Sequence, residues 1–158
     1  MKIFLCLTML AVLVQTVTGR AIKGTITMEN EMKSLSPNLM VNDVSQTLEF
    51  YIKTLGFKKV MTVPDSGNLV WAMVQSGAIT FMFQEKKNIK EEYPQLAQFE
   101  QGGGLSFYIN VTNVQELYDN IKGKVKIVKE LYKTFYGSTD FAIEDNNGYI
   151  LTFSQSAN

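Results

Sequence analysis

The sequence repeats itself once, and this repeat restricts the chain to folds built from two equivalent halves. Four positions with helical spacing in the first half return 70 residues later in the second half. They are Val44, Thr47, Leu48 and Tyr51, matched by Val114, Leu117, Tyr118 and Ile121. A polar residue suited to a helix N-cap precedes each set, namely Asn42 or Asp43 in one half and Asn113 in the other. A fixed offset of this kind indicates a duplicated supersecondary unit.

Short apolar or alternating runs surround both predicted helices and indicate strands. The predicted strands cover residues 35–41, 57–63, 69–76 and 78–85 in the first half, and 105–111, 125–130, 139–144 and 149–153 in the second. Each half therefore has the order βαβββ. We predict an α+β domain over residues 35–155, with module one at 35–85, a linker at 86–104 and module two at 105–155. Within the linker, a short helical segment is expected around residues 91–99.

The beginning of the chain has a different character. Lys2 gives a positive start, Ile3 to Val14 is almost wholly apolar, and small or modest residues lead up to Gly19. This run is too short for a membrane span and is typical of a secretory signal peptide. We predict a signal peptide at residues 1–19, an N-terminal arm at 20–34, and a secreted, extracellular protein. We expect no membrane association after cleavage.

Composition excludes several classes of function. The chain has 15 basic and 15 acidic residues, so the positive excess that nucleic-acid binding requires is absent. The only cysteine, Cys6, lies in the predicted signal peptide, and the chain has no histidine. The predicted mature chain therefore lacks disulfides, thiol nucleophiles and imidazole groups.

Two segments carry a resemblance to a known family. The first runs from Asn38 to Tyr51 (NLMVNDVSQTLEFY) and is followed by Leu55-Gly-Phe57. The second runs from Tyr136-Gly137 through Asp140 to Phe153 (DFAIEDNNGYILTF). With the repeat, they resemble vicinal-oxygen-chelate proteins, the superfamily of glyoxalases, bleomycin-resistance proteins and extradiol dioxygenases. The resemblance implies two curled mixed sheets around a cleft, but it does not choose among the family's activities.

Enzymes of this family bind a divalent metal through residues on the first and last strand of each module. By the repeat, these positions fall on Ser36, Ser106, Met82 and Thr152, and moving the third to Phe81 brings no better ligand. None offers a carboxylate or an imidazole. We therefore predict no metal, no other cofactor and no catalytic residue, which favours a binding protein over an enzyme.

Strand alternation indicates which side chains share the cleft with those positions. The predicted cleft residues are Ser36, Asn38, Met40, Trp71, Thr80, Met82, Gln84, Ser106, Tyr108, Tyr136, Ile150 and Thr152. The set is mixed and contains no acidic residue, so the expected ligand is a small, weakly polar or aromatic molecule. Bleomycin-sequestering relatives are often dimers with clefts completed at the interface, which makes a homodimer one expected assembly.

The sequence leaves two alternative functions open. One is a lyase or isomerase of the same superfamily with an unusual site. The other is an extracellular structural or matrix protein that reuses the fold with a filled cleft.

Asn110-Val-Thr112 is an N-glycosylation sequon. Glu144 and Asp145, beside the predicted last turn, are expected to be solvated loop residues.

Overall fold

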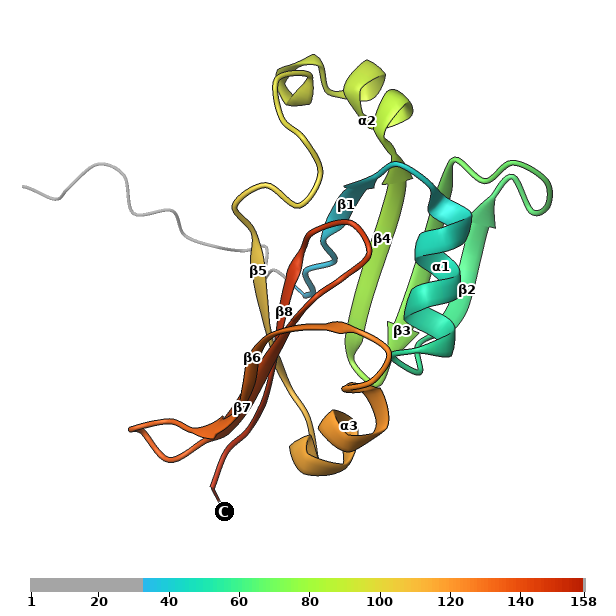
Figure 1. The fold of residues 1–158 in the computed structure, drawn as a ribbon. Coiled ribbons are helices and arrows are strands. Elements are labelled where there is room, and N and C mark those ends of the chain that lie inside the picture. The colour runs from blue at the N-terminus through green and yellow to red at the C-terminus, as the bar shows by residue number, and fades with distance from the viewer. Residues whose placement is uncertain (1–32, 158) are drawn as a thin grey trace, which may run out of the picture. The chain divides into compact units, whose positions relative to one another are not determined.

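The structure, a computed structural model, describes residues 33–157 and contains two four-stranded mixed sheets (Figure 1). The predicted signal peptide and nearly all of the predicted arm lie outside the described residues. Module one contributes β1 (Asn38–Val41), α1 (Val44–Lys53), β2 (Lys58–Val63), β3 (Trp71–Ser76) and β4 (Ile79–Glu85). Module two contributes β5 (Ser106–Asn110), α3 (Val114–Ile121), β6 (Lys126–Lys133), β7 (Thr139–Glu144) and β8 (Ile150–Gln155). This confirms the predicted α+β class and the repeated βαβββ order.

The two sheets have equivalent strand orders, β1-β4-β3-β2 and β5-β8-β7-β6. In each sheet the first strand runs parallel to the last, while the other neighbours are antiparallel. Asn38 pairs with Met82 in module one, and Tyr108 pairs with Thr152 in module two. Each residue of the second pair thus lies 70 positions after its equivalent in the first pair, the same offset that relates the two helices in the sequence.

Helices α1 and α3 begin directly after predicted N-cap residues, Asp43 and Asn113. The side chain of Asp43 accepts a hydrogen bond from the backbone N–H of Gln46, and Asn113 accepts one from Glu116. The predicted face of α1 is buried, whereas in α3 the two end positions are buried and the two middle ones half-buried. Thr54 is the C-cap of α1, and Gly56 follows two residues later. Its φ of +74° lets the chain turn so that Phe57 N–H bonds the Tyr51 carbonyl at 3.0 Å.

The linker differs from the prediction. Its main helix, α2, spans Lys86–Glu92 and precedes the segment where a helix was expected, and only a single 3₁₀ turn, Pro94–Leu96, follows. Lysine and glutamate favour helix in the earlier segment, and Pro94 disfavours helical geometry at the residue before it.

Other boundaries shift by a few residues: β1 begins only after Pro37, and β6 extends to Lys133. Among residues 33–157, no helix is long and apolar enough to cross a membrane.

We call the face of each sheet that packs against its own helix the inner face, and the opposite one the outer face. The modules contact each other through their inner faces. Phe81 of β4 meets Phe107 of β5 edge-on with ring centroids 5.2 Å apart. The β7–β8 turn docks on module one, where Tyr51 Oη donates to Asp145 at 2.9 Å and Tyr149 Oη donates to the Met40 carbonyl at 2.9 Å. The two outer faces therefore point away from the contact between the modules.

Candidate ligand-binding surfaces

The predicted cleft residues lie on two separate outer faces. Asn38, Met40, Trp71, Thr80, Met82 and Gln84 lie on the outer face of module one, with Ser36 just before β1. Ser106, Tyr108, Ile150 and Thr152 lie on that of module two, and Tyr136 lies in the β6–β7 turn. Because the inner faces pack together, one chain does not bring these two groups into a shared cleft.

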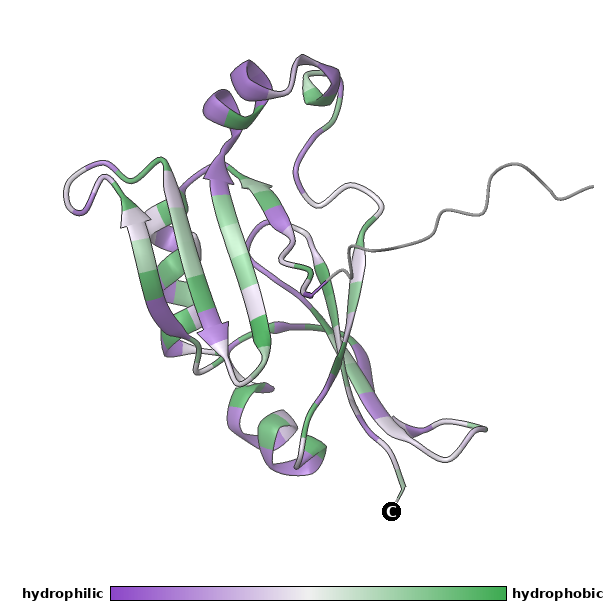
Figure 2. Cartoon of the chain, turned by 180° about the vertical axis from the view of Figure 1, so that it is seen from behind, coloured by the Kyte–Doolittle hydropathy of each residue, from purple (hydrophilic) through white to green (hydrophobic). Residues whose placement is uncertain are grey.

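The outer face of module one is apolar along its middle. Met73 lies between Met61 and Met82 in the sheet register, and Trp71 lies beside Val63. Met61 is 51% exposed and Val63 is 47% exposed. Figure 2 views this sheet from its outer face, with α1 behind it and no helix in front of β2, β3 and β4. Continuous apolar surface of this kind marks a binding or association surface in folded proteins.

A chain of amide hydrogen bonds ends this apolar surface on the side of α2. Asn38 Nδ2 donates to Gln84 Oε1 at 2.6 Å, and Gln84 Nε2 donates to a carboxylate oxygen of Glu92 at 2.8 Å. These bonds fix the orientation of both amides. Asn38 Oδ1 is then left buried without a donor. The structure thus brings Asn38 and Gln84 together, as two predicted site residues, and adds Glu92, which the sequence did not single out.

The outer face of module two holds a buried carboxylate. Asp140 is 1% exposed and is the register partner of Ser154 on the outer side of β8. Its Oδ1 accepts hydrogen bonds from Ser138 Oγ at 2.6 Å and Ser154 Oγ at 2.7 Å. Its Oδ2 accepts from Tyr108 Oη at 2.9 Å and lies 3.4 Å from Tyr136 Oη. We call these five residues the Asp140 cluster.

Asp140 is ionised at neutral pH despite its burial. Desolvation raises its pKa, but the four hydroxyl donors favour the charged form more strongly, so the pKa of Asp140 lies below its ordinary value. The expectation that these faces carry no acidic residue is therefore wrong. The alternation of side chains along β7 could have predicted this position, because Asp140 precedes Phe141, which is an inner-face residue. In the structure Asp140 is the register partner of Ser154.

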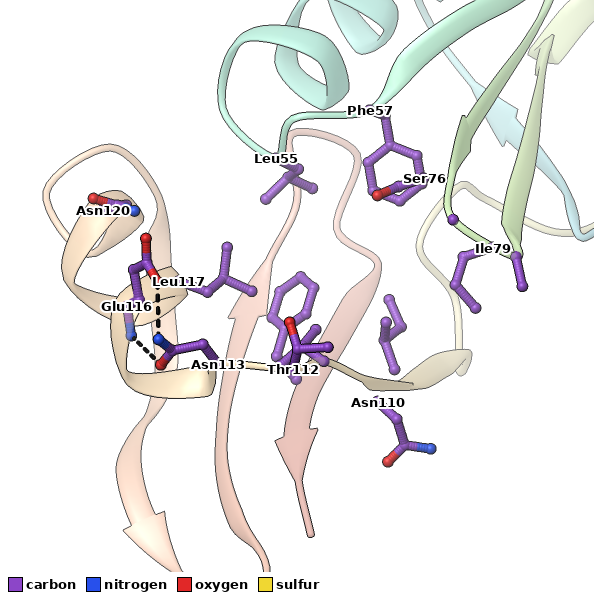
Figure 3. A pocket seen from close by; sticks show the side chains of 15 residues that line it. Leu55, Phe57, Ser76, Ile79, Asn110, Thr112, Asn113, Glu116, Leu117 and Asn120 are labelled. Atoms are coloured by element: carbon purple, nitrogen blue, oxygen red, sulfur yellow. Dashed lines mark hydrogen bonds between the residues drawn. The ribbon is translucent and has the colours of Figure 1, made fainter.

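A cavity of about 580 Å³ lies at the junction of the two modules, apart from the outer faces (Figure 3). Leu55, Leu117 and Ile79 point toward its centre, and Asn113 and Glu116 form part of one wall, joined by hydrogen bonds. Asn110 lies at its edge with its side chain directed outward. The sequence did not predict this cavity, because its walls come from turns and helix ends that meet only through the packing of the modules.

Asp145 corrects another expectation. It is 5% exposed rather than solvated, and besides the Tyr51 hydroxyl it accepts backbone N–H bonds from Asn147 and Tyr149, both at 2.8 Å. Burial raises its pKa above the ordinary value, and the hydrogen bonds only partly offset this effect. Glu144 is half-buried and forms an ion pair with Lys126 at 2.7 Å. Glu144 lies on the outer face of module two as the register partner of Ile150, whereas Asp145 lies in the turn that docks on module one.

The residues at the family's metal-ligand positions do not fit a divalent ion. Ser36 and Met82 belong to module one, and Ser106 and Thr152 belong to module two. Two serines, a threonine and a thioether supply neutral, weak donors in place of carboxylates and imidazoles. Within residues 33–157, no group of three or more histidine, cysteine, aspartate or glutamate side chains is arranged to hold a metal.

The fold is similar to that of several solved structures. A Streptomyces verticillus bleomycin-binding protein, solved with copper(II)-bleomycin, is 22% identical and aligns over 82% of this chain and 99% of its own, with a TM-score of 0.56. A protein of unknown function from Agrobacterium tumefaciens is 20% identical over 81% of this chain and 97% of its own, with a TM-score of 0.65. A Nocardioides glyoxalase/bleomycin resistance protein/dioxygenase is 12% identical over 83% and 89%, with a TM-score of 0.66.

Comparison with curated proteins gave no match. A family model, in contrast, matches residues 33–153, which include every strand and helix of both modules except the last residues of β8. Together with the duplicated βαβββ topology, this match shows that the chain belongs to the Glyoxalase/Bleomycin resistance protein/Dioxygenase superfamily.

Proposed function

We propose that this protein binds a small, weakly polar or aromatic molecule at its outer sheet faces and does so without a metal. The observation that carries the proposal is the uncovered apolar surface formed by Met61, Val63, Trp71, Met73 and Met82. These side chains provide the apolar contact area that a ligand pocket needs, while Asn38 and Gln84 provide a few oriented polar groups. The binding activity stated for the Streptomyces relative supports this class of function.

The binding site in this proposal is completed by a second copy of the chain. One outer face is apolar, whereas the other presents the exposed aromatic rings of Tyr108 and Tyr136, so the two faces are chemically different and suited to enclose an aromatic ligand. In a twofold dimer each copy would offer module one to module two of its partner and form two equivalent clefts. Such an arrangement also removes the apolar face from water.

We also propose that the protein is exported, on the strength of the predicted signal peptide. Sequencing the N-terminus of protein recovered from the culture medium of a eukaryotic host should give Arg20 as the first residue. Asn110 is exposed, so a glycan on the exported protein should be removable by an N-glycosidase. Retention inside the cell with an intact N-terminus would contradict export.

Ligand uptake can be tested with the neutral fluorescent probe N-phenyl-1-naphthylamine. Trp71 is the only tryptophan of the chain, so energy transfer from protein to probe reports binding near the outer face of module one. We expect saturable transfer in the wild type and its loss in Met73→Lys, which places a charge in the apolar surface. Gln98→Lys, at an exposed position in the linker, adds the same charge and should bind normally. Absence of saturable uptake by the wild type would overturn the proposal and favour a structural role.

A further inference from the structure

We infer that the Asp140 cluster is a subsite for an organic cation, such as the ammonium group of an amine or quaternary-ammonium ligand. The inference rests on the proposed function and adds a charged group to the ligand that it describes. The starting point is a buried negative charge that has no cationic partner. None of the ion pairs among residues 33–157 includes Asp140, although the carboxylate is 1% exposed. Buried charges of folded proteins are usually paired, so this one is suited to receive its partner from a ligand.

The hydrogen-bond pattern determines the sign of the group that can bind here. A hydroxyl group has a single proton. Ser138 and Ser154 donate to the carboxylate, the Tyr108 hydroxyl lies 2.9 Å from Asp140 Oδ2 and 2.7 Å from Ser154 Oγ, and the Tyr136 hydroxyl lies 3.4 Å from Asp140 Oδ2. The cluster therefore presents a fixed negative charge and oxygen lone pairs to an approaching ligand. An ammonium group would meet the carboxylate charge and the oxygen dipoles, and Lys129 brings one positive charge to the neighbouring strand β6.

The tyrosine rings provide the contact surface. Tyr108 is 53% exposed and Tyr136 is 60% exposed, although their hydroxyls are directed at a buried group. Donation of the hydroxyl proton to a carboxylate makes an aromatic ring richer in electrons and therefore a better partner for a cation. Both rings thus combine an exposed surface with a hydroxyl that faces the carboxylate, so a cation on either ring would lie near a negative charge.

A lysine of the chain shows that an ammonium group can lie on an aromatic ring close to this cluster. Lys129 Nζ lies 3.8 Å from the centroid of the Tyr132 ring, and Tyr132 is the register partner of Asp140 on β6. Lys129 is exposed and forms no ion pair with Asp140, so it leaves the carboxylate available. The same kind of contact is open to a ligand at Tyr108 and Tyr136.

The test compares choline with 3,3-dimethylbutanol, which has the same shape but no charge, by ligand-observed NMR titration of the full-length protein. We expect the wild type to bind choline about tenfold more tightly than the neutral analogue, a ratio within the range of cation–π and charge contributions. Asp140→Asn should reduce this preference to about threefold or less. Asp119→Asn removes the same charge from an exposed position on α3 and should leave the preference unchanged.

A second pair of variants keeps the test decisive if Asp140→Asn does not fold. Tyr136→Ala removes an exposed ring and should weaken choline binding severalfold, whereas Tyr136→Phe keeps the ring and should retain most of the binding. Equal affinity for the two probes, or an undiminished choline preference in Asp140→Asn or Tyr136→Ala, would overturn the inference. If N-phenyl-1-naphthylamine uptake persists in that case, only the cation subsite is refuted. Loss of both activities refutes the proposed function as well.

Discussion

Tyr51 and Asp145 lie 94 positions apart in the sequence, yet they form the buried hydrogen bond that joins α1 to the β7–β8 turn. Tyr51 is fully buried, and desolvation together with the Asp145 charge raises its pKa well above the ordinary value, so the phenol stays protonated as the donor. Tyr51→Phe leaves the buried carboxylate with one donor fewer. We expect a loss of ~1–3 kcal/mol in the free energy of unfolding, measured by urea denaturation.

The control for this variant is Tyr93→Phe, which removes a hydroxyl from a 47% exposed residue and should change stability little. Equal stability of Tyr51→Phe and wild type would show that Asp145 does not depend on the phenol. The hydrogen bond between Tyr51 and Asp145 would then not contribute to holding the two modules together.

Asp140 gives a pH dependence of defined sign. Because its pKa is lowered in the folded protein, its ionisation contributes stability above the ordinary aspartate pKa, and this contribution is lost as pH falls through the folded-state value. Asp145, whose pKa is raised, changes stability in the opposite sense. We expect the urea midpoint of the wild type to fall more steeply than that of Asp140→Asn when the pH is lowered from about 5 to 3, around and below the ordinary aspartate value. Parallel pH curves for the two proteins would contradict the hydroxyl-stabilised carboxylate.

At the scale of elements, the linker is positioned by one close backbone contact. Gly102 has a φ of +74°, and a Cβ built on it would lie 2.7 Å from the carbonyl oxygen of Asn147 in the β7–β8 turn. Gly104 has a similar φ of +73° but has open space where its Cβ would be. The two glycines therefore share a left-handed φ, but only Gly102 has a close neighbour where a Cβ would lie.

Alanine substitutions at Gly102 and Gly104 separate the cost of a strained backbone from the cost of a steric clash. Gly104→Ala should lower the free energy of unfolding by ~1–2 kcal/mol because of its left-handed backbone. Gly102→Ala should cost a further ~1–3 kcal/mol, because the linker or the turn must move. Thermal and urea unfolding of both variants would measure the difference. Equal losses would mean that the linker does not pack against the turn as described.

The sequence was most informative about the helices, the strands and the register of the sheets. The helical positions from Val44 to Tyr51, the caps Asp43 and Asn113, and the 70-residue offset predicted both helices and the equivalent registers of the two sheets, because each depends on local pattern. Packing between the modules was not predictable in this way. The Asp140 cluster requires hydroxyls from Tyr108, Tyr136 and Ser154 to converge, and the junction cavity requires α3 to meet the β3–β4 turn.

At the scale of the whole molecule, the packing of the modules determines what the outer faces can do. Since the inner faces are joined by Phe81, Phe107 and the docked β7–β8 turn, the predicted cleft residues form two surfaces in place of one cleft. In the proposed site, the apolar surface of one module and the Asp140 cluster of the other are complementary halves. The proposed site therefore requires a second copy of the chain to bring them together.

Native mass spectrometry of the purified protein, with metal analysis of the same sample, tests whether two chains share a metal-free ligand site. We expect a species of two chains that carries a small organic molecule and no stoichiometric divalent metal, and a single ligand-free chain for Met73→Lys. A wild-type protein that is a single chain without a ligand would contradict the shared cleft. A stoichiometric divalent metal would contradict the metal-free site.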